Sequence, residues 1–241
     1  MDPLEQLKNQ NLIWQGLQSQ RKISRIASQY PELDEKLQGG LPEQGVIQID
    51  SVTGIGELRL FIPYLKHKQN LGLIVFVNPP NALNAEFFVQ QNIDLQNILI
   101  VKHKDVKSDL WCVEQCLKSG CCATVCYWGS NISQAQARRY MLATESQNTS
   151  LLLFAQEMRS VDLAIIDSPQ ISTISLPITL KINLTPSKSG LWLQVIKQKG
   201  GQALTKFHID YLNVWADLYI PNTNQTLIAE KVALQQRQQL H

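Results

Sequence analysis

A glycine turn between an apolar strand and a helix is the part of this sequence best suited to hold a phosphate group. The octet from Ser51 to Leu58 reads S-V-T-G-I-G-E-L. Phosphate-binding loops need glycines that let backbone N–H groups approach the phosphates, a Lys for the β- and γ-phosphates, and a Ser or Thr hydroxyl for Mg²⁺. Gly54 and Gly56 supply the turn, but Glu57 stands at the lysine position and Leu58 at the hydroxyl position.

The exchange of lysine for Glu57 replaces attraction for a polyanion by repulsion. At about 4 Å each pair of unit charges contributes about 1 kcal/mol in water and about 4 kcal/mol near a protein surface. A helix dipole is equivalent to about half a charge and does not offset that reversal. We therefore expect a vestigial phosphate loop kept for its geometry, in a protein without ATPase activity, cofactor or metal.

Apolar strands that alternate with helices surround this loop and predict an α/β fold with a mainly parallel sheet. Strands are expected at 46–50, 71–77, 97–101, 123–128 and 150–154, and helices at 58–66, 84–92, 108–119 and 133–144. The entry at 26–45 is rich in glycine and proline and is expected to be rich in loops. After residue 169 the pattern changes, because 177–184 and 190–197 predict an antiparallel hairpin that extends the sheet, with 205–211 as a third strand.

Both ends of the chain carry apolar stripes at helical spacing, and we expect them to flank a core at 25–219. The stripe of the N-terminal arm (1–24) consists of Leu4, Leu7, Trp14 and Leu17. The stripe of the tail (220–241) consists of Leu227, Ile228, Val232 and Leu234. Each stripe suits a partner's groove and equally suits the protein's own core.

Charge and composition exclude some classes of function. The net charge of +2 gives no sign of a dedicated nucleic-acid binder. Arg138 and Arg139, with Lys197 and Lys199, form either a modest basic patch or ordinary solvated charges. The chain begins without a signal-peptide pattern and has no apolar run near the length of a membrane span, so a cytoplasmic location is expected.

Five cysteines lie close together between Cys112 and Cys126. An odd number in one short stretch is typical of reduced thiols rather than of a disulfide framework. The stretch has no C-x-x-C pair, and His103 is the nearest histidine, so we interpret the thiols as small apolar side chains rather than as metal ligands.

Two segments resemble the core of the RecA recombinase. The sequence YPELDEKLQGGLPEQG followed by VIQID is similar to the RecA entry, and residues 74–101 are similar to the next strand-helix-strand unit. The resemblance places the catalytic glutamate at Pro80 and the metal-binding aspartate at the end of 123–128, where Tyr127 and Trp128 stand. Since the lysine is also missing, the resemblance implies a degenerate RecA-like core.

A more specific resemblance is to the ImuA family and its relative SulA, both RecA-like proteins of the bacterial SOS response. It rests on DLWCVEQCLKSG at 109–120, the strand that follows, the Arg138-Arg139 helix and GLWLQVIKQKGG at 190–201. An ImuA-type protein acts in translesion DNA synthesis with ImuB, a polymerase-like protein, and with RecA. A SulA-type protein instead binds FtsZ and blocks its polymerisation. The GGLP entry at 39–42 favours the ImuA type.

Overall fold

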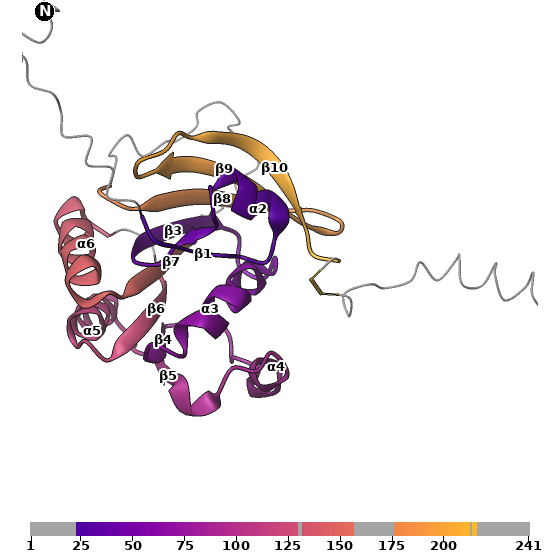
Figure 1. Ribbon diagram of the computed structural model, residues 1–241. Helices are drawn as coiled ribbons and strands as arrows, with labels where there is room; N and C mark the ends of the chain where they lie inside the picture. Colours follow the sequence, from indigo (N-terminus) through magenta and orange to yellow (C-terminus); the bar gives the residue numbers. More distant parts are fainter. Residues whose placement is uncertain (1–22, 130–131, 157–175, 213, 216–241) are drawn as a thin grey trace, which may run out of the picture.

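A computed structural model of the chain describes residues 23–129, 132–156, 176–212 and 214–215 (Figure 1). The two terminal stripes predicted from the sequence lie outside the described residues. Among the described residues, no helix has both the length and the apolar character needed to span a bilayer.

The described residues are built around an eight-stranded sheet with the order β10-β9-β8-β3-β7-β6-β4-β5. Six of these strands run parallel, as β3 pairs with β7 and β8, β6 with β7 and β4, and β4 with β5. The parallel strands are β3 (Gly45–Ser51), β4 (Leu73–Val77), β5 (Ile98–Val101), β6 (Cys122–Trp128), β7 (Ser150–Gln156) and β8 (Leu180–Pro186). The predicted α/β fold with a mainly parallel sheet is confirmed.

The predicted antiparallel extension is also confirmed. β9 (Gly190–Gln198) pairs antiparallel with β8, and β10 (Leu204–Asp210) pairs antiparallel with β9. The first strand of the hairpin begins a few residues later than predicted, because β8 takes its register from β3, with Leu180 opposite Ile47. The extension therefore lies directly beside the strand that leads into the glycine loop.

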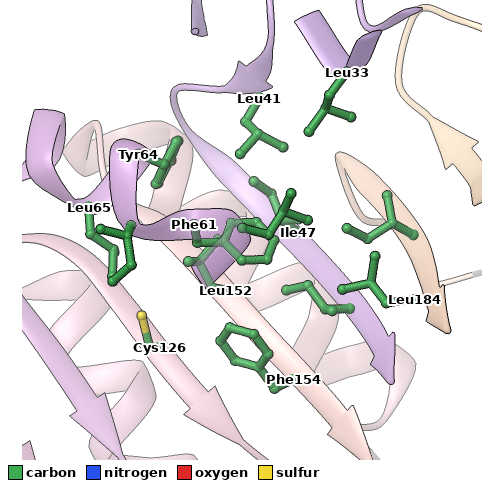
Figure 2. Packing of buried hydrophobic residues seen from close by; sticks show 14 of the residues in the cluster. Leu33, Leu41, Ile47, Phe61, Tyr64, Leu65, Cys126, Leu152, Phe154 and Leu184 are labelled. Atoms are coloured by element: carbon green, nitrogen blue, oxygen red, sulfur yellow. The ribbon is translucent and has the colours of Figure 1, made fainter. Parts of the chain in front are cut away.

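Each face of the sheet is covered by its own set of helices (Figure 1). One face carries α2 (Pro31–Lys36), α3 (Ile62–Lys68) and α4 (Ala85–Gln90), and the other carries α5 (Val106–Lys118) and α6 (Gln134–Gln147). Neighbouring residues of one strand point to opposite faces. Leu152 and Phe154 therefore pack in the α3 core, shown in Figure 2, whereas Leu151 and Leu153 pack under α5 and α6.

The entry at 26–45, expected to be rich in loops, also contains two short regular elements. This segment contains α2 and the strand β2 (Leu41–Pro42), which pairs with β1 (Arg25–Ile26). Pro31 suits the start of the helix, and Leu33 is fully buried in the core. A helix of six residues is too short to show a clear apolar period.

α3 is bound through Tyr64 and Lys68 to the segment that leads into β3. The Tyr64 hydroxyl contacts the carbonyl oxygens of Pro42 at 3.0 Å and Glu43 at 3.1 Å, and Lys68 Nζ donates to the Glu43 carbonyl at 3.0 Å. Lys68 is fully buried. Burial lowers the pKa of its ammonium group to about 8, against the opposing effect of the Glu43 carboxylate.

Lys68 is expected to make the protein more stable as the pH rises. Its pKa of about 8 in the folded state lies below the ordinary value of 10.5. Between these two pH values the Lys68 side chain of the unfolded chain therefore binds more protons than that of the folded chain. The free energy of unfolding should rise by about 1 kcal/mol between pH 7 and pH 9 through this group. Urea denaturation should show a smaller rise for Lys68→Met, and equal slopes for the two proteins would contradict the assignment.

Candidate functional site

The glycine loop follows β3 at the carboxyl edge of the parallel strands, where α/β proteins commonly bind ligands. Gly54 and Gly56 have φ angles of 87° and 89°, in the left-handed region that favours glycine. Gly56 precedes a short 3₁₀ helix, η1 (Glu57–Phe61), which leads into α3. The helix predicted at 58–66 thus begins as a 3₁₀ turn and continues to Lys68.

Glu57 stands where a phosphate loop has its lysine, but its side chain binds the backbone of the protein's own loop. Its two carboxylate oxygens lie 3.2 and 3.1 Å from the Gly54 amide nitrogen and accept its hydrogen bond. The side chain is only 6% exposed. A backbone N–H in a glycine turn is the type of donor that contacts phosphate in a phosphate loop. Here that donor is satisfied by the protein's own carboxylate.

Beside the loop lies a cavity of about 600 Å³. One wall is formed by residues 54–59, and the opposite wall by the β8–β9 turn, including Lys188 and Ser189, together with Tyr211 and Leu212. Phe87 of α4 also lines the cavity. This volume lies in the range typical of small-molecule sites, so size alone does not exclude a nucleotide.

The segment after β10 is hydrogen-bonded to the glycine loop and to the start of α2. The Tyr211 hydroxyl donates to the Gly56 carbonyl at 2.9 Å, and Trp215 Nε1 donates to the Tyr30 hydroxyl at 2.8 Å. The Tyr30 and Tyr211 rings lie 5.7 Å apart. Burial raises the pKa of both phenols, that of Tyr30 to about 12, so both stay neutral and add no charge to the loop.

Two cations line the cavity and must be weighed against Glu57. The guanidinium of Arg59 packs over the rings of Phe87 at 5.7 Å and Trp215 at 5.8 Å. Lys188 is exposed on the hairpin turn, where solvent screens its charge. Neither side chain occupies the lysine position next to Gly56. The carboxylate of Glu57 is therefore the charge nearest the loop amide.

At the end of β4, Asn78 adopts a left-handed conformation with φ 52°, and Pro80, at the position of the expected catalytic glutamate, is exposed. The carboxylate in this region is that of Asp109, which is 2% exposed. It accepts a hydrogen bond from Asn78 Nδ2 at 3.1 Å and lies 3.2 Å from His103 Nδ1. Because Asp109 is enclosed by these two partners, its role here is to fasten α5 to the ends of β4 and β5.

Asp109→Ala is expected to lower the free energy of unfolding by about 2 kcal/mol, since Asn78 and His103 would lose their shared partner. Asp109→Asn keeps an acceptor and should lose less. Urea denaturation at pH 7 compares the two variants with the parent protein. A parent-like midpoint for Asp109→Ala would show that the carboxylate has no structural role.

At the end of β6, the expected metal-ligand position belongs to the hydrophobic core. Trp128 is 5% exposed, and its ring stacks on Phe154 with a centroid distance of 4.6 Å and an interplanar angle of 7°. The ring of Phe76 also stacks on that of Trp128, with a centroid distance of 6.0 Å. Tyr127 points to the opposite face, where burial raises its pKa to about 12. Neither side chain offers an ionised oxygen to a metal.

A second hollow of about 500 Å³ lies on the outer side of α6. Its floor is apolar and its rim is basic; the lining residues are Arg138, Met141, Leu142, Pro177, Ile178, Lys197 and Lys199. We call this set the α6 surface. Leu142 is 68% exposed in it. Lys199 pairs with Glu145 at 2.8 Å, whereas Arg138 has no acidic partner among the described residues.

Three of the four predicted basic residues thus meet at the α6 surface. The fourth, Arg139, lies apart from it, because its Nε is 3.5 Å from Glu114 of α5. The apolar floor could not be predicted from local patterns, since it combines α6 with Pro177 and Ile178, which are distant in the chain. Tyr211 and Trp215 could not be predicted for the same reason, and no local pattern marks them as partners of the loop.

All five cysteines lie within the described residues. Within the residues that the structure describes, no group of three potential ligand side chains is arranged around a common point. All five are free thiols, with Cys121 exposed and Cys112, Cys122 and Cys126 buried.

The chain is similar in sequence to RecA proteins over about two fifths of its length. It is 28% identical over 99 residues to RecA of Thermosynechococcus vestitus and 30% identical over 105 residues to RecA of Nostoc punctiforme. These stretches are 41% and 43% of this chain but only 28% and 29% of the two relatives. The chain therefore spans less than a third of the curated relatives that it matches.

No family model matches the chain. Among solved structures it is similar to the crystal structure of SulA from Pseudomonas aeruginosa, with a TM-score of 0.39 and 22% sequence identity. That likeness covers 46% of this chain and 98% of the SulA chain. The chain is thus RecA-like in part of its sequence.

Proposed function

We propose that this protein is a non-catalytic, RecA-like adaptor of the SOS response, of the ImuA type, which acts in translesion DNA synthesis. Its partners would be an ImuB-type polymerase-like protein and RecA itself. The observation that carries this proposal is the hydrogen bond between the Glu57 carboxylate and the Gly54 amide. Because the protein's own carboxylate occupies the loop donor that would contact phosphate, we infer that the fold serves as a scaffold.

The proposal is supported by what has happened to the other catalytic positions that the RecA resemblance defines. Pro80 offers no base, and Trp128 is stacked in the core on Phe154. Restoring a lysine at residue 57 would therefore leave hydrolysis without a base or a metal ligand. Loss of all three functions, with the sheet intact, is what an adaptor built on an ATPase fold would show.

An adaptor also needs a place for its partner, and the α6 surface fits one. Leu142 is an exposed apolar side chain, and Arg138 beside it has no acidic partner within the described part of the chain. This pair suits a partner segment that carries an apolar anchor flanked by carboxylates. We therefore assign the α6 surface as the docking site for the ImuB-type partner.

Purification of the full chain together with an ImuB-type protein tests the proposal, with RecA and FtsZ assayed in parallel. A stable complex with the ImuB-type protein, or with RecA, that needs no nucleotide is the expected result. Binding to FtsZ alone, with filamentous cells on expression, would replace the adaptor role by the SulA-type role. Repeating the assay without residues 220–241 shows whether the tail contributes.

A further inference from the structure

The cysteine-rich turn between α5 and β6 holds sulfur atoms close together at the surface. Cys121 is exposed, whereas Cys122, the first residue of β6, is 7% exposed. Their Sγ atoms are 3.9 Å apart. Ser119 Oγ lies 3.0 Å from Cys121 Sγ and 3.4 Å from Cys122 Sγ. Neither the loop after β3 nor the α6 surface uses these thiols.

The turn places the two sulfurs on the same side, although successive side chains of a strand normally point to opposite faces. The pairing of β6 with β4 shifts register here, with Leu73 opposite Cys122 and Ile74 opposite Thr124. The Leu73 amide donates to the Cys121 carbonyl at 2.9 Å, which holds the backbone at that shift. The two sulfurs thus lie together at the point where the chain enters the sheet, directly before the extra residue Ala123.

The two thiols also differ in chemistry. Hydrogen bonds from Cys116, Ser119 and Cys121 lower the pKa of the Cys122 thiol and outweigh the opposing effect of burial. In the pair of Cys116 and Cys122, the Cys116 thiol stays protonated and donates, and this raises its own pKa. Cys122 is therefore the better nucleophile, while Cys121 is the thiol that a dissolved oxidant reaches first.

We infer that Cys121 and Cys122 form an oxidation site, at which hydrogen peroxide converts the pair into a reversible disulfide. Peroxide oxidises the Cys121 thiol to a sulfenic acid and is reduced to water. The Cys122 thiolate then attacks the Cys121 sulfur, forms the S–S bond and releases hydroxide. A disulfide between adjacent residues holds the two Cα atoms closer than most disulfides do, so thiol reductants should reopen it readily.

Tryptic mapping of the full chain after treatment with hydrogen peroxide tests the inference directly. Cys112 and Cys116 fall in the peptide 108–118, while Cys121, Cys122 and Cys126 fall in the peptide 119–138. The expected product is a peptide 119–138 lighter by two hydrogens, with two of the five thiols lost to alkylation and both recovered after dithiothreitol. A disulfide that joins the two peptides, or five unchanged thiols, would overturn the assignment.

Serine variants separate the two roles. In Cys122→Ser, dimedone should label Cys121, because its sulfenic acid is no longer consumed. In Cys121→Ser, no disulfide should form within peptide 119–138, whereas Cys126→Ser should form it as the parent chain does. Loss of the disulfide in Cys126→Ser, with Cys121→Ser unaffected, would also overturn the inference.

Discussion

Replacing Trp128 by alanine is expected to lower the free energy of unfolding by about 3–5 kcal/mol. The indole lies between Phe154, at 4.6 Å, and Phe76, at 6.0 Å, and Figure 2 shows Phe154 among the residues of this core. Phe61 of η1 meets the same Phe154 ring edge-on at 5.7 Å. Removing the indole would leave a cavity in the core between the sheet and α3. Urea denaturation followed by circular dichroism measures the loss.

Two matched variants make the Trp128 result specific. Trp128→Phe keeps a stacked ring and removes Nε1, which has no hydrogen-bond partner among the described residues, so it should cost less than about 1.5 kcal/mol. Trp111→Ala removes an indole that is 65% exposed and should change the stability by at most about 0.5 kcal/mol. Equal losses for Trp128→Ala and Trp111→Ala would show that the end of β6 is not part of the core.

The double variant Arg138→Glu/Leu142→Asp is expected to weaken binding of the ImuB-type partner at least about ten-fold. The first change reverses the cation of the α6 surface that has no acidic partner among the described residues, and the second places a carboxylate on its apolar floor. Both side chains are exposed, so the thermal midpoint should stay close to that of the parent protein. Titration calorimetry with the purified partner measures the affinity.

Arg139→Glu provides the control for this prediction. It makes the same charge change on the next residue of α6, but Arg139 lies against Glu114 and outside the α6 surface. Binding should therefore stay within about two-fold of the parent value. If Arg139→Glu weakens binding as much as the double variant, net charge rather than the α6 surface governs the interaction.

Local patterns were sufficient to predict the strands of the sheet, because β3, β6 and β7 are apolar runs bounded by turn residues. They also placed Glu57 on the lysine position. They did not reveal that its carboxylate binds Gly54, since that contact depends on a 3₁₀ start to the helix and on left-handed glycines.

Contacts between distant residues were beyond the reach of those patterns. The hydrogen bond from Tyr211 to Gly56 spans 155 positions, and that from Trp215 to Tyr30 spans 185. The floor of the α6 surface likewise joins a helix to residues before β8. Such pairs depend on how β10 returns along the sheet, which single-sequence periodicity does not encode.

The cavity beside the glycine loop is large enough for a nucleotide. Under the proposed function, triphosphate is therefore excluded by the charges and hydrogen bonds of the loop and not by its size. The Gly54 amide is already bonded to Glu57, and a phosphate group that displaced this carboxylate would meet its negative charge within a few ångströms. Arg59 is stacked on aromatic rings, and Lys188 is solvated.

Calorimetric titration of the full chain with ATP and Mg²⁺ is the direct test of whether this fold has become a scaffold. With Glu57 on the Gly54 amide, no saturable heat should appear up to about 1 mM nucleotide. Saturable binding at micromolar concentration that is lost when Lys188 is replaced by alanine would place triphosphate in the cavity, and would contradict the account.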